Sequence, residues 1–193
     1  MKGYERYLFG NYELKTGKME ISTELIYKYF SEIHFSKGDY LLRSGEVEKH
    51  LYYLESGMVR IFHYDFHRDK ETTVDFIFPN QFCLSYESFR DGTPSILELQ
   101  AISDVCAYRI DKQLLDTMMK DERFIAIKLQ IMEELFVQKA RKEIQFLTQS
   151  PEQIYKHLIE KEPFLVQKLP LKYIASYIGI TPQALSRIRK RIF

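Results

Sequence analysis

Residues 170–188 read PLKYIASYIGITPQALSRI, and this stretch decides the fold of the C-terminal part of the chain. The segment 170–178 predicts one helix with proline in its first turn, and Gly179 can adopt the left-handed conformation of a sharp turn. Thr181 provides an N-cap for a second helix, which we expect over about 183–192. Two short helices at this spacing predict a helix-turn-helix.

The apolar positions support this interpretation because they fall on facing sides of the two helices. Ala175 is small enough for the helices to touch there. The expected inward residues are Ile174, Ile178, Ile180, Leu185 and Ile188.

The outward positions of the second helix are polar or basic. Arg187 can contact guanine with two hydrogen bonds, and Gln183 can pair with adenine. The other outward side chains suit phosphates, which position a protein on DNA. The predicted DNA-binding residues are Thr181, Gln183, Ser186, Arg187, Lys190 and Arg191. A helical hairpin with a solvated basic face is the alternative.

The charge distribution is uneven, although the net charge is only +1. Residues 168–193 carry six Lys and Arg and no acidic residue, whereas the rest of the chain has 22 basic against 27 acidic residues. An acidic body with a basic tail indicates a polyanionic partner for the tail. A basic helix end that complements its own dipole would explain the tail equally well.

Between His34 and Asp111 the pattern is one of short strands separated by turn residues such as Ser56-Gly57. Such spacing predicts a closed antiparallel roll. The expected fold class is α+β, with an N-terminal antiparallel β-roll of the jelly-roll type, a long dimerisation helix and a C-terminal (winged) helix-turn-helix. We expect any wing to precede the helix pair or to be absent. The expected domains are 1–148 and 149–193.

Residues 121–148 show helical periodicity over about 40 Å. Their apolar positions form a stripe, with a second stripe beside it at the start. We expect one stripe to pair with the same helix of a second chain, giving a two-fold homodimer. The predicted dimer residues are Ile125, Leu129, Met132, Phe136 and Ala140. A helix buried within one subunit is the alternative.

Composition excludes several classes of protein. No run approaches the roughly 18 apolar residues of a membrane helix, and residues 1–6 do not start a signal peptide. The two cysteines, Cys83 and Cys106, form neither a disulfide framework nor a zinc site, and the five histidines include no helical ligand pair. We therefore expect a cytoplasmic protein that binds no metal and no membrane. The sequence identifies no cofactor.

With these motifs in view, nearly the whole chain resembles the Crp/Fnr family of bacterial transcription regulators. The similar stretches in the roll are Gly38-Asp39, Gly45-Glu46, 51–54 and 57–60, and residues 180–187 match the recognition helix. The resemblance implies a homodimer that binds a two-fold related site on double-stranded DNA, contacts RNA polymerase and responds to a small-molecule effector in the roll.

The chain departs from the family where cyclic-nucleotide-binding members hold the ligand. Ser85-Tyr86 replaces the Gly-Glu that binds the ribose, and Ser95 replaces the arginine that binds the phosphate. Burying a phosphate without a cation costs on the order of several kcal/mol, so cyclic AMP in the usual mode is not expected. The candidate effector-pocket residues are Phe82, Cys83, Ser85, Tyr86, Glu87, Ser95 and Ile96.

Other differences concern sensing and base readout. Glu87 is one residue out of register for the ribose-binding glutamate, and Cys83 is either a thiol sensor or a buried, unreactive thiol. Two cysteines are too few for an iron–sulfur cluster. In the recognition helix the family's frequent Arg-Glu pair is Pro182-Gln183, whereas Arg187 is kept. The DNA sequence recognised should therefore differ from that of the cyclic-AMP receptor.

Two other functions remain open at this point. One is a small-molecule-binding module, with non-classical ligand contacts and weak or vestigial DNA binding. The other is an enzyme with a cupin-like metal roll, which would need a His/Glu cluster on facing strands that the strand region does not offer. The main prediction is a non-enzymatic, DNA-binding transcriptional regulator.

Overall fold

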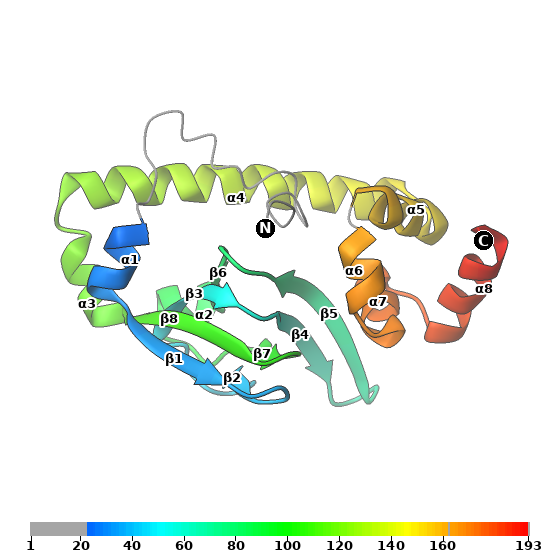
Figure 1. The fold of residues 1–193 in the computed structure, drawn as a ribbon, viewed down its shortest axis with the longest axis horizontal. Coiled ribbons are helices and arrows are strands. Elements are labelled where there is room, and N and C mark those ends of the chain that lie inside the picture. The colour runs from blue at the N-terminus through cyan, green and yellow to red at the C-terminus, as the bar shows by residue number, and fades with distance from the viewer. Residues whose placement is uncertain (1–22, 162, 193) are drawn as a thin grey trace. The chain divides into compact units, whose positions relative to one another are not determined.

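The computed structural model describes residues 23–161 and 163–192 (Figure 1). The described residues up to Ile125 form one compact unit, and those from Ala126 onward form another. The first unit is built mainly of strands and the second entirely of helices.

The N-terminal unit contains eight strands and three short helices among its described residues. The strands are β1 (Ser31–Phe35), β2 (Tyr40–Leu42), β3 (His50–Ser56), β4 (Val59–Asp65), β5 (Lys70–Ile77), β6 (Phe82–Cys83), β7 (Glu98–Ala101) and β8 (Val105–Asp111). The helices are α1 (Thr23–Tyr29), α2 (Tyr86–Asp91) and α3 (Lys112–Met118).

The strands form two four-stranded antiparallel sheets with the orders β1-β8-β3-β6 and β2-β7-β4-β5. Alternation along each strand directs one set of side chains inward, and these side chains fill the space between the sheets. The core includes Leu42, Leu54, Val59, Leu99 and Ala107, each less than 5% exposed. The predicted antiparallel roll is confirmed as a β-sandwich.

Two chain segments cross between the sheets at one corner of the sandwich. Gly57 connects β3 to β4, and residues 102–104 connect β7 to β8. The Met58 amide donates to Ser103 Oγ at 3.0 Å. Gly57 has a φ of +89°, and a Cβ there would lie 2.2 Å from the Asp104 carbonyl oxygen. Only glycine fits this corner without displacing backbone.

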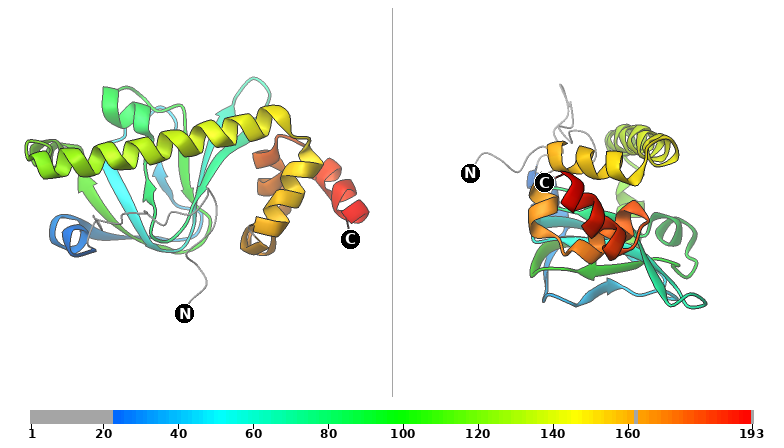
Figure 2. Two further views of the ribbon diagram at one scale, coloured as in Figure 1. Left: turned by 90° about the horizontal axis from the view of Figure 1, so that it is seen from above. Right: turned by 90° about the vertical axis from the view of Figure 1, so that its right-hand side faces the viewer.

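The C-terminal unit consists of helices. They are α4 (Glu122–Thr148), whose first turn belongs to the N-terminal unit, α5 (Pro151–Lys161), α6 (Pro163–Lys168), α7 (Leu171–Ile178) and α8 (Pro182–Ile192). Figure 2 shows α4 as one continuous helix. Ser150 Oγ accepts the Gln153 amide at 3.3 Å and the Gln153 side chain accepts the Ser150 amide at 2.8 Å, a reciprocal cap that starts α5.

Most elements lie where the sequence predicted them, including the long helix and the helix pair at the end. The helices α2 and α6 were not predicted. From Lys112 onward the described residues contain no strand, so no β wing accompanies the helix pair there. No described helix is long and apolar enough to cross a membrane.

Candidate nucleic-acid interface and ligand pocket

The helices α7 and α8 are joined by a tight turn. Gly179 has a φ of +84°, in the left-handed region, as its position in the sequence predicted. The Ile180 amide donates to the Ala175 carbonyl at 3.0 Å, which closes the end of α7. Thr181 Oγ1 accepts the Ala184 amide at 3.1 Å, so the predicted N-cap of α8 is confirmed.

The facing sides of the two helices are apolar and packed. Ala175 and Leu185 are completely buried, and Ile180 is partly buried. The other buried residues of this pair are Ile174, Tyr177, Ile178 and Ile188. The ring of Tyr177 also contacts the ring of Phe146 on α4, at 5.4 Å between centroids, so the pair has a defined packing partner.

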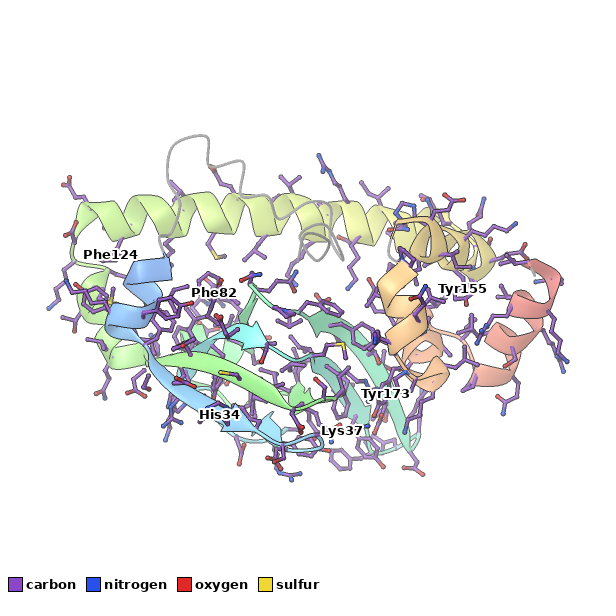
Figure 3. All side chains as sticks on the ribbon, viewed as in Figure 1. His34, Lys37, Phe82, Phe124, Tyr155 and Tyr173 are labelled. Carbon is purple, nitrogen blue, oxygen red and sulfur yellow. The ribbon has the colours of Figure 1, made fainter. Side chains whose placement is uncertain are left out.

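The opposite side of α8 is polar and exposed. Successive helical residues are about 100° apart, so Arg187 lies about 200° around the helix from buried Leu185. Gln183 and Lys190 share this outward side, and all three are exposed. Arg189 lies only about 40° from Leu185, and its charge acts on the phenol of buried Tyr155 in α5 (Figure 3).

The remaining predicted DNA contacts lie at the edge of this surface. Arg191 is 2.8 Å from a carboxylate oxygen of Glu152 in α5, and Ser186 is partly buried. The hydrogen bond from Lys156 and the charge of Arg191 hold the pKa of Glu152 below its ordinary value. A shallow groove of about 730 Å³ runs between the start of α5 and α8, and Arg187, Lys190 and Arg191 line it.

The predicted dimer stripe of α4 leaves its apolar side chains in solvent in the single chain. Phe136 is 74% exposed and Leu129 is 60% exposed. Ile125 is also exposed, and Met132 and Ala140 are partly buried. Ile144 and Leu147 continue the stripe to the end of the helix and are exposed too. Such a row of apolar side chains is unfavourable in water and favours burial by another surface.

Among the predicted residues of the candidate ligand pocket, Ser85 and Ser95 form a hydrogen-bonded pair. Ser85 and Ser95 are buried, and their hydroxyl oxygens lie 2.9 Å apart. Ser95 Oγ also accepts the Leu97 amide at 3.0 Å. Among the described residues, no lysine or arginine is hydrogen-bonded to either serine.

A buried carboxyl group lies against these serines, and the sequence analysis did not identify it. Glu48 is 2% exposed and accepts the backbone amides of His50 at 3.1 Å and Ser85 at 3.5 Å. Its own amide donates to Ser88 Oγ at 2.9 Å. Burial raises the pKa of Glu48 to about 7, because the surroundings disfavour the charged form. No local sequence signal distinguishes Glu48 from the exposed Glu46 nearby.

The other predicted pocket residues are divided between the core and the surface. Cys83 is fully buried, and burial together with the carboxylates of Glu48 and Asp75 raises the pKa of its thiol well above the ordinary value. The ring of Phe82 packs on that of Tyr53, at 5.4 Å between centroids. The remaining predicted residues, Tyr86, Glu87 and Ile96, are exposed.

Among the described residues of the sandwich, the buried side chains include one basic group, that of Arg60. Arg60 of β4 is buried, but its guanidinium donates to Glu71 at 2.6 Å and to Thr73 at 2.9 Å. This arginine is therefore engaged by its own sheet. A cation for a cyclic phosphate would have to come from a rearrangement of the pocket.

The strand-rich unit of this chain is similar to a known domain family. Residues 32–122 match the family model of the cyclic nucleotide-binding domain. No curated protein is significantly similar to the chain in sequence.

Solved structures match over most of the chain. CLP of Xanthomonas campestris, described as a c-di-GMP responsive global regulator, has a TM-score of 0.69 and 17% identity over 90% of this chain and 91% of its own. FixK2 of Bradyrhizobium japonicum has a TM-score of 0.68 and 17% identity, with 84% of each chain covered. A protein of Eubacterium rectale assigned to the crp/fnr family has a TM-score of 0.65 and 16% identity over 93% of this chain and 86% of its own.

The chain contains a cyclic nucleotide-binding domain. Over most of its length it shares its fold with regulators of the Crp/Fnr family.

Proposed function

We propose that this chain is a homodimeric, sequence-specific DNA-binding regulator of transcription of the Crp/Fnr type. In this proposal α7 and α8 are the helix-turn-helix, and α8 enters the major groove as the recognition helix. Arg187 and Gln183 contact bases, and Lys190 contacts phosphates. In this proposal the functions divide at the end of α4, within the C-terminal compact unit: residues 1–148 sense and dimerise, while 149–193 bind DNA.

One observation carries the proposal: α8 buries Leu185 and Ile188 on one side and exposes the basic side chains of Arg187 and Lys190 on the other. Leu185 and Ile188 hold the helix in the domain, whereas Arg187 and Lys190 form none of the ion pairs observed among the described residues. Of the basic residues on this side, Arg191 pairs with Glu152, and the exposed charges of Arg187 and Lys190 suit a ligand that supplies negative charge. DNA supplies phosphates that can contact the basic side chains and base edges that can accept hydrogen bonds from the guanidinium.

The exposed stripe of α4 supports a dimer through that helix. Full burial of a Leu, Ile or Phe side chain stabilises by about 1.5–3 kcal/mol. A second copy of α4 presents the same stripe, so pairing of the two helices buries both stripes at once. Two recognition helices then lie about 34 Å apart, the spacing of successive major grooves on one side of DNA.

Signal reception in this proposal does not use cyclic AMP in the usual mode. The hydrogen-bonded pair Ser85–Ser95 and the carboxyl of Glu48 fill the place where a phosphate would bind. An effector of another chemistry, or a change in the roll itself, would alter the population of dimers whose helices fit DNA.

The proposal is tested by selecting bound duplexes from a random library and measuring affinity by fluorescence anisotropy. Arg187→Ala should weaken binding to the selected duplex by about 1–3 kcal/mol and relax preference at one base pair per half-site. Arg189→Ala is the matched control, since it removes the same charge from the side of α8 that carries buried Leu185.

The control variant should retain the base preference of the wild type. Equal losses for Arg187→Ala on selected and random duplexes would contradict the base-reading role. No binding of wild-type protein to any duplex at low salt would contradict the proposed function as a whole.

A further inference from the structure

Three side chains with metal-ligating atoms meet on the N-terminal sandwich, on the strands β1 and β8. His34 Nε2 lies 2.9 Å from Glu32 Oε1, and Cys106 Sγ lies 3.6 Å from the same oxygen. Ligand atoms of all three residues lie within 4.8 Å of one another. The three donors are an imidazole nitrogen, a carboxylate oxygen and a thiol sulfur.

The strand pairing produces this arrangement. Residues Glu32 and His34 are two apart on β1, so they share one side of the sheet, while Ile33 and Phe35 between and after them pack toward the core. His34 is directly opposite Cys106 in the antiparallel register of β1 and β8. The cluster therefore lies on the outer side of the sheet, where Figure 3 shows His34.

The distances are close to those of a tetrahedral metal site. Zinc binds nitrogen and oxygen at about 2.0–2.2 Å and sulfur at about 2.3 Å, which places neighbouring ligand atoms roughly 3.3–3.7 Å apart. The contact between Cys106 and Glu32 already has this length. The contact between His34 and Glu32 must lengthen by a few tenths of an ångström, which exposed side chains achieve by small rotations.

We propose that Glu32, His34 and Cys106 form a binding site for a zinc-like divalent transition-metal ion. The mixture of imidazole, thiolate and carboxylate excludes calcium and magnesium, which prefer oxygen ligands alone. Three protein ligands leave the fourth tetrahedral position to water. The ion connects β1, the edge strand of its sheet, to β8.

The local charges favour a cation at this position. The carboxylates of Glu32 and Glu55 act on Cys106 and supply negative charge near the cluster. Binding forms a metal–sulfur bond and releases the thiol proton to solvent. This inference is independent of the proposed function in DNA binding.

Cobalt(II) titration of the metal-free full-length protein tests the site, since a cobalt–thiolate bond produces a charge-transfer band in the near ultraviolet. The wild type should bind one equivalent and show this band. Cys106→Ser should lose the band, and His34→Gln and Glu32→Gln should weaken binding by at least about tenfold. His67→Gln, an exposed histidine in the β4–β5 turn, is the matched control and should bind as the wild type does.

A second measurement reads the thiol directly. Zinc alone should slow alkylation of Cys106 in the wild type, while Cys83 remains unreactive in the fold because it is buried. The protection should disappear in His34→Gln, whose circular dichroism should match the wild type because the side chain is exposed. A thiolate band that survives Cys106→Ser, or alkylation unaffected by zinc, would overturn the proposal.

Discussion

The hydroxyls of Ser85 and Ser95 are hydrogen-bonded to each other in the interior of the sandwich, with their oxygens 2.9 Å apart. By the resemblance to the Crp/Fnr family, Ser85 is expected at the glycine of the Gly-Glu pair and Ser95 at the arginine. Here the two short side chains are hydrogen-bonded to each other, and the Glu48 carboxyl accepts the Ser85 amide.

We expect no stabilisation of the protein by cyclic AMP or cyclic GMP. A ligand at 100 times its Kd raises the free energy of unfolding by about 2.7 kcal/mol, which thermal unfolding readily detects. The buried serines offer no positive charge for the phosphate, so the melting temperature should stay unchanged. 5′-AMP serves as the control nucleotide. A rise in melting temperature with a cyclic nucleotide but not with 5′-AMP would contradict the expectation.

Glu48→Gln should stabilise the protein at alkaline pH. The pKa of Glu48 is raised from 4.5 to about 7, so between these values the folded state holds a proton that the unfolded state releases. The stabilising contribution of the protonated carboxyl is complete below about pH 4.5 and is lost as pH rises through 7. The resulting cost is at most about 3.4 kcal/mol, since one pKa unit corresponds to 1.36 kcal/mol.

Urea unfolding of Glu48→Gln and wild type between about pH 5 and 8.5 measures this difference. The advantage of the variant should grow from about pH 5 to about pH 7 and level off at higher pH. The neighbouring variant Glu46→Gln is the control, because Glu46 is exposed. A difference between Glu48→Gln and wild type that does not change with pH would exclude the raised pKa.

Gly57→Ala should destabilise the sandwich much more than Gly38→Ala. Both glycines have positive φ, +89° and +99°, so both variants carry the cost of about 1–2 kcal/mol for a left-handed residue with a Cβ. Only at Gly57 does the new methyl group also meet backbone, 2.2 Å from the Asp104 carbonyl oxygen. Denaturant unfolding should therefore show an additional loss of about 2 kcal/mol or more at Gly57. Equal losses would mean that the corner adjusts freely.

Lys190→Ala should weaken binding to all duplexes alike. A phosphate contact releases a counterion, so its removal lowers the slope of log K against log salt by about 0.9. Anisotropy titrations at several salt concentrations, on selected and random duplexes, measure both effects. Arg189→Ala is again the control of equal charge. A loss confined to the selected duplex would assign Lys190 to base recognition instead.

Phe136→Glu should convert the proposed dimer into a monomer that remains folded. The side chain is 74% exposed in the single chain, so its replacement creates no cavity. Within a dimer the same change buries a charge against apolar side chains, which costs several kcal/mol. Sedimentation equilibrium measures the association. Arg141→Ala changes the charge of α4 by the same amount away from the stripe and should remain a dimer.

The features predicted correctly from the sequence are those that depend on neighbouring residues. Thr181 caps α8 and Gly179 turns left-handed because the reasons for both lie within a few positions of the chain. The burial of Glu48 depends on strands and turns that meet only in the folded sandwich. Local composition does not reveal this burial.

The cluster of Glu32, His34 and Cys106 has the same origin as the burial of Glu48. More than 70 residues separate Cys106 from the other two, and only the pairing of β1 with β8 brings them together. No metal was predicted from the sequence, because the three ligands show no regular spacing along the chain. Ligands contributed by two strands leave no such spacing.

The corner at Gly57 determines where this sandwich can yield. Backbone meets backbone there, with the Ile102 amide donating to the Met58 carbonyl at 2.9 Å and no room for a side chain. Glu48 precedes β3 and Ser95 precedes β7, so both lie at the ends of these strands opposite the corner. The backbone contact at Gly57 resists widening of the corner, and we expect an effector in the roll to separate the two sheets at the ends near Glu48 and Ser95.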